Sequence, residues 1–200
     1  MARNPLYDRT TALDKAVALF WEKGYHGSSM KQIEQALDMR PGSLYAAFGS
    51  KDGLYCEALE RYAAAGAVEL AQHMRHHDSI IGGLQHYLRN IARACATGEP
   101  APSRACMIVK TLLETSHTHQ GLSDQAREIL AGIEKGLTEQ LDEAARRGEL
   151  QTDVDTARLA RLLQSQIMGL RAIAERDLPT EQIEALGDDM AVLLNAYRAA

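Results

Sequence analysis

Apolar residues recur with a helical period along almost the whole chain, and no segment has the alternating pattern of a half-buried β-strand. In the first periodic segment Leu13, Val17 and Phe20 share one face, and Gly24 ends it. Longer segments follow, separated by short polar or Gly- and Pro-containing breaks such as 98–103. They span residues 51–76, 79–97, 104–117, 122–147, 155–176 and 180–198. The pattern predicts an all-α protein of about nine helices.

Two short helices are expected between the first helix and residue 51. Ser29 and Gln32 have the spacing of a capping box, in which each side chain satisfies a backbone amide of the helix start. Asp38 tolerates the left-handed backbone of a tight turn, and Pro41 suits the first position of a helix ending near residue 48. Ser50 is expected to cap the next helix. Short helices joined in this way form a helix-turn-helix, whose second helix enters the major groove of DNA.

The segment 24–54, GYHGSSMKQIEQALDMRPGSLYAAFGSKDGL, resembles the N-terminal head of the TetR/AcrR family of repressors nearly position by position. The resemblance implies a helix-turn-helix DNA-binding domain over residues 1–52 and a helical ligand-binding and dimerisation domain over residues 53–200. It further implies three partners: a pseudo-palindromic double-stranded DNA operator, a second copy of the chain, and a small-molecule inducer that releases the repressor. Ligand binding would spread the two heads so that they no longer match successive major grooves. The matching residues are Gly24, Tyr25, Ser28, Ser29, Ile33, Gly42, Ser43, Leu44, Tyr45, Phe48, Ser50, Lys51, Asp52 and Leu54.

The same resemblance assigns roles in DNA binding. Tyr45 and Lys51 match positions that contact phosphate, and Lys51 also lies at a helix N-terminus, where amides hold phosphate. Arg40 replaces the usual Ser or Thr cap, which weakens the helix start but supplies a guanidinium that can read guanine. Ala47 replaces a polar residue, and Asp38 replaces the common turn glycine. The expected DNA contacts are Ser28, Ser29, Lys31, Arg40, Pro41, Gly42, Ser43, Tyr45, Ala46 and Lys51.

Candidate residues in the rest of the chain are assigned by architecture, because the resemblance there extends to the helical layout alone. The last two long helices carry broad apolar stripes, which either a dimer interface or an ordinary core would produce. Polar groups on otherwise apolar helix faces are candidates for orienting a ligand. The expected ligand-binding residues are Tyr62, Met74, Tyr87, Cys106, Met107, Thr111, Glu114 and His117, and the expected dimerisation residues are Leu159, Leu163, Gln166, Ile167, Leu170, Met190, Leu194 and Tyr197.

An alternative mode of release is sensing of electrophiles or oxidants through Cys106. This cysteine begins an apolar helical run after a Pro-rich linker, and a thiol near a helix N-terminus can have a lowered pKa, with Arg104 and Lys110 close in sequence. Cysteine is also a common small core residue, and that interpretation stays open.

Charge is distributed unevenly along the chain. The net charge is −5, but residues 1–52 carry seven Lys and Arg against six Asp and Glu, so the acidic excess lies in residues 53–200. Phosphate repels an acidic body, which favours presenting the head alone to DNA. No apolar run reaches membrane-spanning length, and the start of the chain lacks the apolar core of a signal peptide, so the cytoplasm is expected.

Motifs of other functional classes are missing from the sequence. The three cysteines form no CxxC pair, and His73, His76 and His77 are interpreted as a solvated run, so no metal and no cofactor are expected. The sequence contains no phosphate loop or nucleophile motif, and we therefore expect no enzymatic activity. An interaction protein that kept the head but lost DNA binding is the remaining alternative, favoured by the nearly neutral head and by Ala47.

Overall fold

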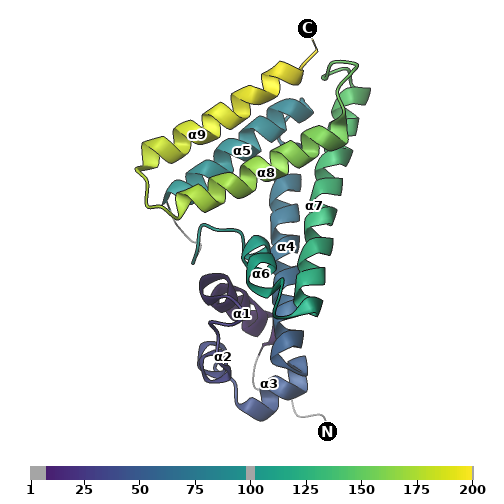
Figure 1. Cartoon of the computed structure of the whole chain (residues 1–200). Coiled ribbons are helices and arrows are strands. Elements are labelled where there is room, and N and C mark those ends of the chain that lie inside the picture. The colour runs from purple at the N-terminus through teal and green to yellow at the C-terminus, as the bar shows by residue number, and fades with distance from the viewer. Residues whose placement is uncertain (1–7, 98–101, 200) are drawn as a thin grey trace. The chain divides into compact units, whose positions relative to one another are not determined.

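The computed structural model describes residues 8–97 and 102–199. Within these ranges the regular structure is helical, which confirms the predicted fold class (Figure 1). The helices are α1 (Arg9–Lys23), α2 (Met30–Leu37), α3 (Pro41–Phe48), α4 (Lys51–Arg75), α5 (Ile80–Thr97), α6 (Met107–Thr115), α7 (Gln120–Arg146), α8 (Thr156–Ala174), α9 (Thr180–Leu193) and the 3₁₀ helix η1 (Leu194–Tyr197). None of these helices is long and apolar enough to cross a membrane. The expectation about the N-terminal leader concerns residues 1–5, which lie outside the described ranges.

The chain forms two compact units. The first combines residues up to 64 with residues 107–127, and the second combines residues 65–106 with the chain from 128 onward. Helices α4 and α7 therefore each contribute residues to both units. A compact unit is a packing entity, so the functional division expected at residue 52 stays a prediction.

The first unit is built around the apolar faces of its short helices. Helix α1 packs against α2. Phe20, Ile33 and Leu44, one from each of the first three helices, are fully buried. The rings of Phe20 and Tyr55 meet edge to face with 4.7 Å between their centroids. The core therefore holds α2 and α3 by one face each and leaves their other faces to solvent.

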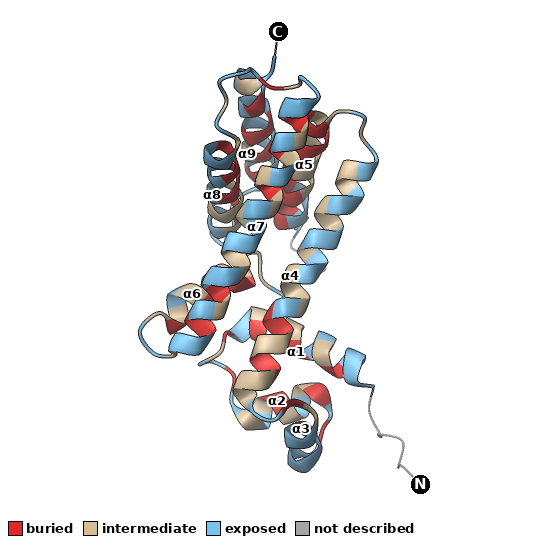
Figure 2. Cartoon of the chain, turned by 90° about the vertical axis from the view of Figure 1, so that its right-hand side faces the viewer, coloured by how far each residue is buried: buried red, intermediate tan, exposed pale blue. Residues whose placement is uncertain are grey.

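The second unit is a bundle in which α5 packs along α9 and also contacts α8 (Figure 1). Its buried residues lie on the sides of these helices that face one another (Figure 2). Gly187 lets α9 approach α5 closely, because a Cβ at this position would lie 2.3 Å from the Cβ of Ala92. This bundle is the largest apolar core of the described residues.

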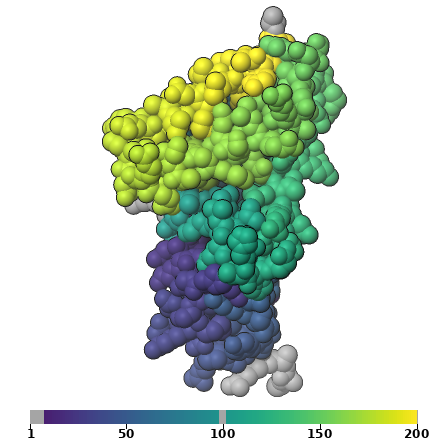
Figure 3. Space-filling model, in the orientation of Figure 1, coloured from purple at the N-terminus to yellow at the C-terminus, as the bar shows by residue number. Residues whose placement is uncertain are grey.

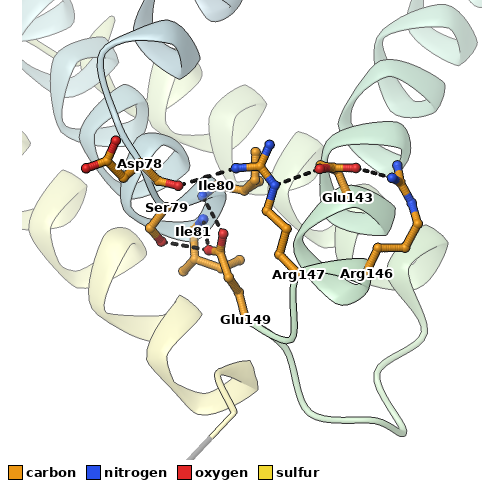
Figure 4. Close-up of polar contacts among 8 residues, drawn as sticks. All are labelled: Asp78, Ser79, Ile80, Ile81, Glu143, Arg146, Arg147 and Glu149. Carbon is orange, nitrogen blue, oxygen red and sulfur yellow. Dashed lines mark hydrogen bonds and ion pairs between the residues drawn. The ribbon is translucent and has the colours of Figure 1, made fainter.

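The loop between α7 and α8 caps the start of α5 (Figure 4). The carboxylate of Glu149 accepts hydrogen bonds from the amides of Ile80 and Ile81, both at 2.9 Å, and from the hydroxyl of Ser79 at 2.6 Å. Arg147, beside it, donates to the carbonyl of Asp78. The first amides of a helix have no partner within the helix, and here a carboxylate distant in sequence supplies one.

Two helices differ from the sequence prediction because of contacts with distant residues. The helix expected over 104–117 begins at Met107, since the amide of Ala105 and the hydroxyl of Ser103 both donate to Glu175 at 2.6 Å. The helix expected over 180–198 becomes a 3₁₀ turn at Leu194, beyond which the carbonyl of Tyr197 accepts from the amide of Gln151. Of the linker expected over 98–103, residues 98–101 lie outside the described ranges.

Candidate nucleic-acid interface

The start of α2 and the turn after it have the geometry that the sequence predicts. The Ser29 hydroxyl accepts from the Gln32 amide, and the Gln32 side chain accepts from the Ser29 amide, which confirms the capping box. Asp38 adopts the left-handed conformation at φ 53°, and Pro41 is the first residue of α3. These features fix where the second helix of the pair begins.

Helix α3 buries one face and exposes the other. Leu44 and Phe48 are buried, whereas 51% of Tyr45 is exposed. Arg40 precedes the helix, and its side chain makes no capping hydrogen bond, because a guanidinium has donors only and the first amides of a helix need an acceptor. The exposed face combines a cation, small residues and a phenol, which suits close approach to base edges and phosphates. Its members are Arg40, Pro41, Gly42, Ser43, Tyr45 and Ala46.

Of the three residues near the start of α2 that are expected to contact DNA, two are exposed and one is buried. Ser29 and Lys31 are exposed. Ser28 is fully buried, and its hydroxyl donates to the carbonyl of Gly24 at 2.7 Å. The side chain of Ser28 therefore holds the corner between α1 and α2 and has no exposed oxygen to offer DNA.

Lys51, at the start of α4, lies over an aromatic ring. Its ammonium nitrogen is 4.2 Å from the ring centroid of Tyr25, and desolvation lowers the pKa of this lysine. The Tyr25 hydroxyl donates to Asp52, and burial together with this hydrogen bond raises the pKa of Tyr25 to about 12. The Ser50 hydroxyl accepts from the Gly53 amide at 3.0 Å, as expected for a cap. Lys51 is thus positioned by its neighbours as well as by its helix.

Asp52 also contacts His119, the residue directly before α7. The Nδ1 of His119 accepts from the Leu122 amide, which assigns the proton to Nε2, 3.0 Å from the Asp52 carboxylate. Hydrogen bonds from Tyr25 and His119 lower the pKa of Asp52. The carboxylate therefore stays ionised beside Lys51 and fixes the phenol of Tyr25.

The ligand candidates of the first unit are mostly engaged in contacts of their own. The Thr111 hydroxyl lies 2.7 Å from that of Tyr55, and Glu114 accepts from two backbone amides of residues 25 and 26. The ring of Tyr62 packs on Trp21. Met107 is buried and His117 is exposed. The acceptor role of Glu114 gives no local signal in the sequence, because its partners lie 88 and 89 residues away.

The ligand candidates of the second unit are Met74, Tyr87 and Cys106. Met74 packs closely against Gly83, because a Cβ at Gly83 would lie 2.9 Å from the Met74 methyl carbon. The ring of Tyr87 packs on that of His73, with 5.6 Å between their centroids. Cys106 is partly exposed. A pocket of about 470 Å³ in this unit lies between residues 151–155, the start of α8 and Tyr197, and none of the three lines it.

The histidine run is less solvated than expected. His73 and His77 both pack against His86 on α5, with ring centroids 5.2 and 4.9 Å apart, and His76 is exposed. Within residues 8–97 and 102–199, no group of three or more His, Cys, Asp or Glu side chains is placed to hold a metal ion.

The dimerisation candidates lie mainly inside the bundle of the second unit. Gln166, Ile167 and Tyr197 keep partial exposure. Helices α8 and α9 lie side by side at the surface (Figure 3), and the large apolar side chains exposed on them are Leu162, Ile173, Val192 and Leu193. The other candidates are buried among the chain's own residues and leave almost no surface for a partner. They are Leu159, Leu163, Leu170, Met190 and Leu194.

Comparison with known proteins identifies similar chains over nearly the whole length. Residues 12–58 match the model of the bacterial regulatory proteins of the tetR family, and residues 83–183 match that of the tetracyclin repressor-like C-terminal domain. The chain is 29% identical to the HTH-type transcriptional repressor ComR of Escherichia coli K12, over 90% of this chain and 86% of ComR.

Solved structures show the same fold. The TetR family transcriptional regulator CifR, as a cysteine mutant complexed with a 26-bp double-strand operator DNA, has a TM-score of 0.85 at 28% identity, over 94% of this chain and 98% of CifR. The reduced form of E. coli NemR has a TM-score of 0.81 over 96% of each chain; its identity of 17% makes it a likeness of fold alone.

Proposed function

Because the chain belongs to the TetR family of bacterial regulatory proteins, we propose that it represses transcription by binding a pseudo-palindromic operator as a homodimer, and that a small molecule releases it. It is a DNA-binding transcriptional regulator and not an enzyme. A regulator of this kind acts where the chromosome is, so we place it in the cytoplasm. In this proposal residues 1–52 bind DNA, and residues 53–200 form the dimer and bind the ligand.

The exposed face of α3 is the observation that carries this proposal. Ser43 and Tyr45 are exposed on a helix whose opposite face is buried, and Arg40 is exposed directly before that helix. A rod of eight residues with one free face is suited to a major groove about 12 Å wide. With Ser29, Lys31, Pro41, Gly42, Ala46 and Lys51, these residues form the proposed DNA-binding surface.

Three variants test the assignment of roles. Tyr45→Phe and Lys51→Ala should weaken binding to every duplex, because they remove phosphate contacts, and Lys51→Ala should lower the salt slope of log Kd by about 1. Arg40→Ala should cost about 1–3 kcal/mol on the preferred duplex and relax its base preference. Gel shifts use a duplex selected by the wild type from a random pool, with its scrambled version as control. Unchanged affinity in all three variants contradicts the assignment.

The proposed homodimer uses the exposed side of α8 together with the end of α9. Leu162, Gln166 and Ile173 lie four and seven residues apart, so they share one face of α8. Leu193 on α9 is 55% exposed. Exposed large apolar side chains that gather on one side of a helix are typical of an interaction surface, and two heads are needed to contact two half-sites.

Release by a small molecule rests on the family and on one feature of α7. The Ser123 hydroxyl and the side-chain oxygen of Gln125 are buried, and neither has a hydrogen-bond partner among the residues that the structure describes. Buried polar groups without partners are groups that a ligand or a water satisfies. Thermal shift against a panel of small lipophilic compounds, followed by operator release with each hit, tests this part. Hits that stabilise the protein but leave it on DNA contradict release.

The second candidate is release by modification of Cys106. This thiol is partly exposed and immediately precedes α6, whereas burial raises the pKa of both Cys56 and Cys95 and keeps their thiols protonated. N-ethylmaleimide should then abolish operator binding by the wild type and spare the Cys106→Ser variant. Equal sensitivity of the two proteins contradicts thiol sensing.

A further inference from the structure

Helix α6 contacts the corner between α1 and α2 through side chains at four-residue spacing. Lys110 donates to the carbonyls of Trp21 and Glu22 at 2.5 and 3.2 Å. Glu114 accepts from the amides of Tyr25 and His26 at 2.9 and 2.6 Å. Residues four apart lie on one face of a helix, so one side of α6 binds the backbone of residues 21–26. We name Lys110 and Glu114 the α6 clamp.

The chemistry of the α6 clamp matches the backbone that it holds. The last carbonyls of a helix have no partner within it and carry partial negative charge, which the ammonium of Lys110 satisfies. The amides after the helix end are donors, and the carboxylate of Glu114 accepts both through charge-assisted hydrogen bonds. The cation therefore binds the carbonyls at the end of α1, and the carboxylate binds the amides that follow them.

Gly24 makes the approach of Glu114 possible. A Cβ at this position would lie 2.5 Å from the Oε2 atom of Glu114, and the residue itself has φ 74°. The corner is therefore shaped around the carboxylate, and a side chain at residue 24 would displace it.

The corner held by the α6 clamp also contacts the start of α2 and the start of α4, where some of the proposed DNA contacts lie. Its Gly24 carbonyl accepts from Ser28, directly before the cap of α2. The ring of Tyr25 supports the ammonium of Lys51, and its hydroxyl donates to Asp52 at the start of α4. A displacement of the corner would therefore move Lys51 and the first residue of α2 together.

We propose that Lys110 and Glu114 are positioning residues for DNA binding: α6 sets the orientation of the helix-turn-helix by holding the backbone of residues 21–26. This inference rests on the proposed function, because it assumes that the surface of α2, α3 and Lys51 binds an operator. It assigns Glu114 to the α6 clamp and not to an inducer.

Glu149 provides a matched control. Its carboxylate also accepts from two consecutive backbone amides, those of Ile80 and Ile81, but in the second unit and at the start of α5. Glu114→Gln and Glu149→Gln therefore remove the same kind of interaction. Only the first change should alter the DNA-binding surface.

The experiment measures fluorescence anisotropy with the duplex selected by the wild type, at a temperature where circular dichroism shows each variant folded. Glu114→Gln and Lys110→Met should each weaken binding at least about fivefold. Glu149→Gln should lower the thermal midpoint but stay within about twofold of wild-type affinity. Hydrogen exchange should accelerate at the amides of Tyr25 and His26 in Glu114→Gln, and not in Glu149→Gln.

The outcomes separate the inference from the proposed function. If the wild type binds the duplex and Glu114→Gln and Lys110→Met bind it equally well, the positioning role is overturned while the proposed function stands. A loss of affinity that is the same for Glu114→Gln and Glu149→Gln also overturns it, because general destabilisation would then explain both. A wild type that selects no duplex overturns the proposed function, and the inference with it.

Discussion

Gly24 has φ 74° and ψ −178°, a backbone region that residues with a Cβ rarely adopt. It also lies against the carboxylate of Glu114, so two independent constraints act on one position. The sequence predicts Gly24 as a helix stop, because glycine commonly ends helices. The second constraint comes from a residue ninety positions away and leaves no local signal.

We predict that Gly24→Ala destabilises the chain by about 1–3 kcal/mol from backbone strain alone, and by more because of the contact with Glu114. Gly148→Ala is the control: Gly148 has φ 73°, but a Cβ there meets nothing within 4 Å. Urea denaturation measures both. In the Glu114→Ala background, Gly24→Ala should lower the free energy of unfolding by less than it does in the wild type, because the clash with the carboxylate is gone. If the effects of the two substitutions simply add, the contact with Glu114 does not contribute.

At the scale of single residues, local rules predict the head well and the rest poorly. The cap at Ser29, the left-handed Asp38 and Pro41 at the start of α3 depend on neighbours within three residues, and the structure confirms them. The contacts of Ser28 and Glu114 depend on folding. Sequence therefore locates the surface of α3, but not the supports behind it.

At the scale of elements, helix ends are determined by partners from elsewhere in the chain. Glu149 satisfies the first amides of α5, and Glu175 holds the residues before α6. Periodicity predicts that these helices exist, because it depends on which residues are buried. It does not predict where they begin, since a cap distant in sequence has no period.

Glu149 gives a pH-dependent prediction. Burial alone would raise its pKa, but hydrogen bonds from Ser79 and from the amides of Ile81 and Ile80 outweigh it, so the pKa lies below the usual 4.5. The carboxylate therefore stabilises the fold above about pH 4.5, and this contribution is lost as the pH falls through the lowered pKa. Wild type and Glu149→Gln should differ by about 1–2 kcal/mol at pH 7 and converge toward pH 3. A difference that is the same at both pH values would contradict the prediction.

At the scale of the whole molecule, the sequence predicts an all-α regulator with a distinct head, and it cannot separate a dimer face from a core. Both give apolar stripes of the same period on α8 and α9. In the structure Leu159, Leu163 and Leu170 fill the bundle, whereas Leu162 and Ile173 of the same helix are exposed.

We predict that Leu162→Glu combined with Leu193→Glu converts a dimer to a monomer, because two carboxylates would be buried in an apolar interface. Both side chains are exposed in the single chain, so its fold should persist. Leu113→Glu on α6 is the control, since Leu113 is 75% exposed and lies in the first unit. Sedimentation velocity measures the result. A double variant that remains dimeric would place the interface elsewhere.

The proposed function requires the exposed face of α3 to lie in the major groove of an operator. Dimethyl sulfate tests it directly, because it methylates guanine at N7 in the major groove and adenine at N3 in the minor groove. With the duplex selected by the wild type, we predict protection of guanine N7 in two half-sites about one helical turn apart, or a multiple of that spacing, and its loss with Arg40→Ala at the guanines that Arg40 reads. Protection of adenine N3 alone, or no protection at low salt, would show that α3 does not bind in the major groove.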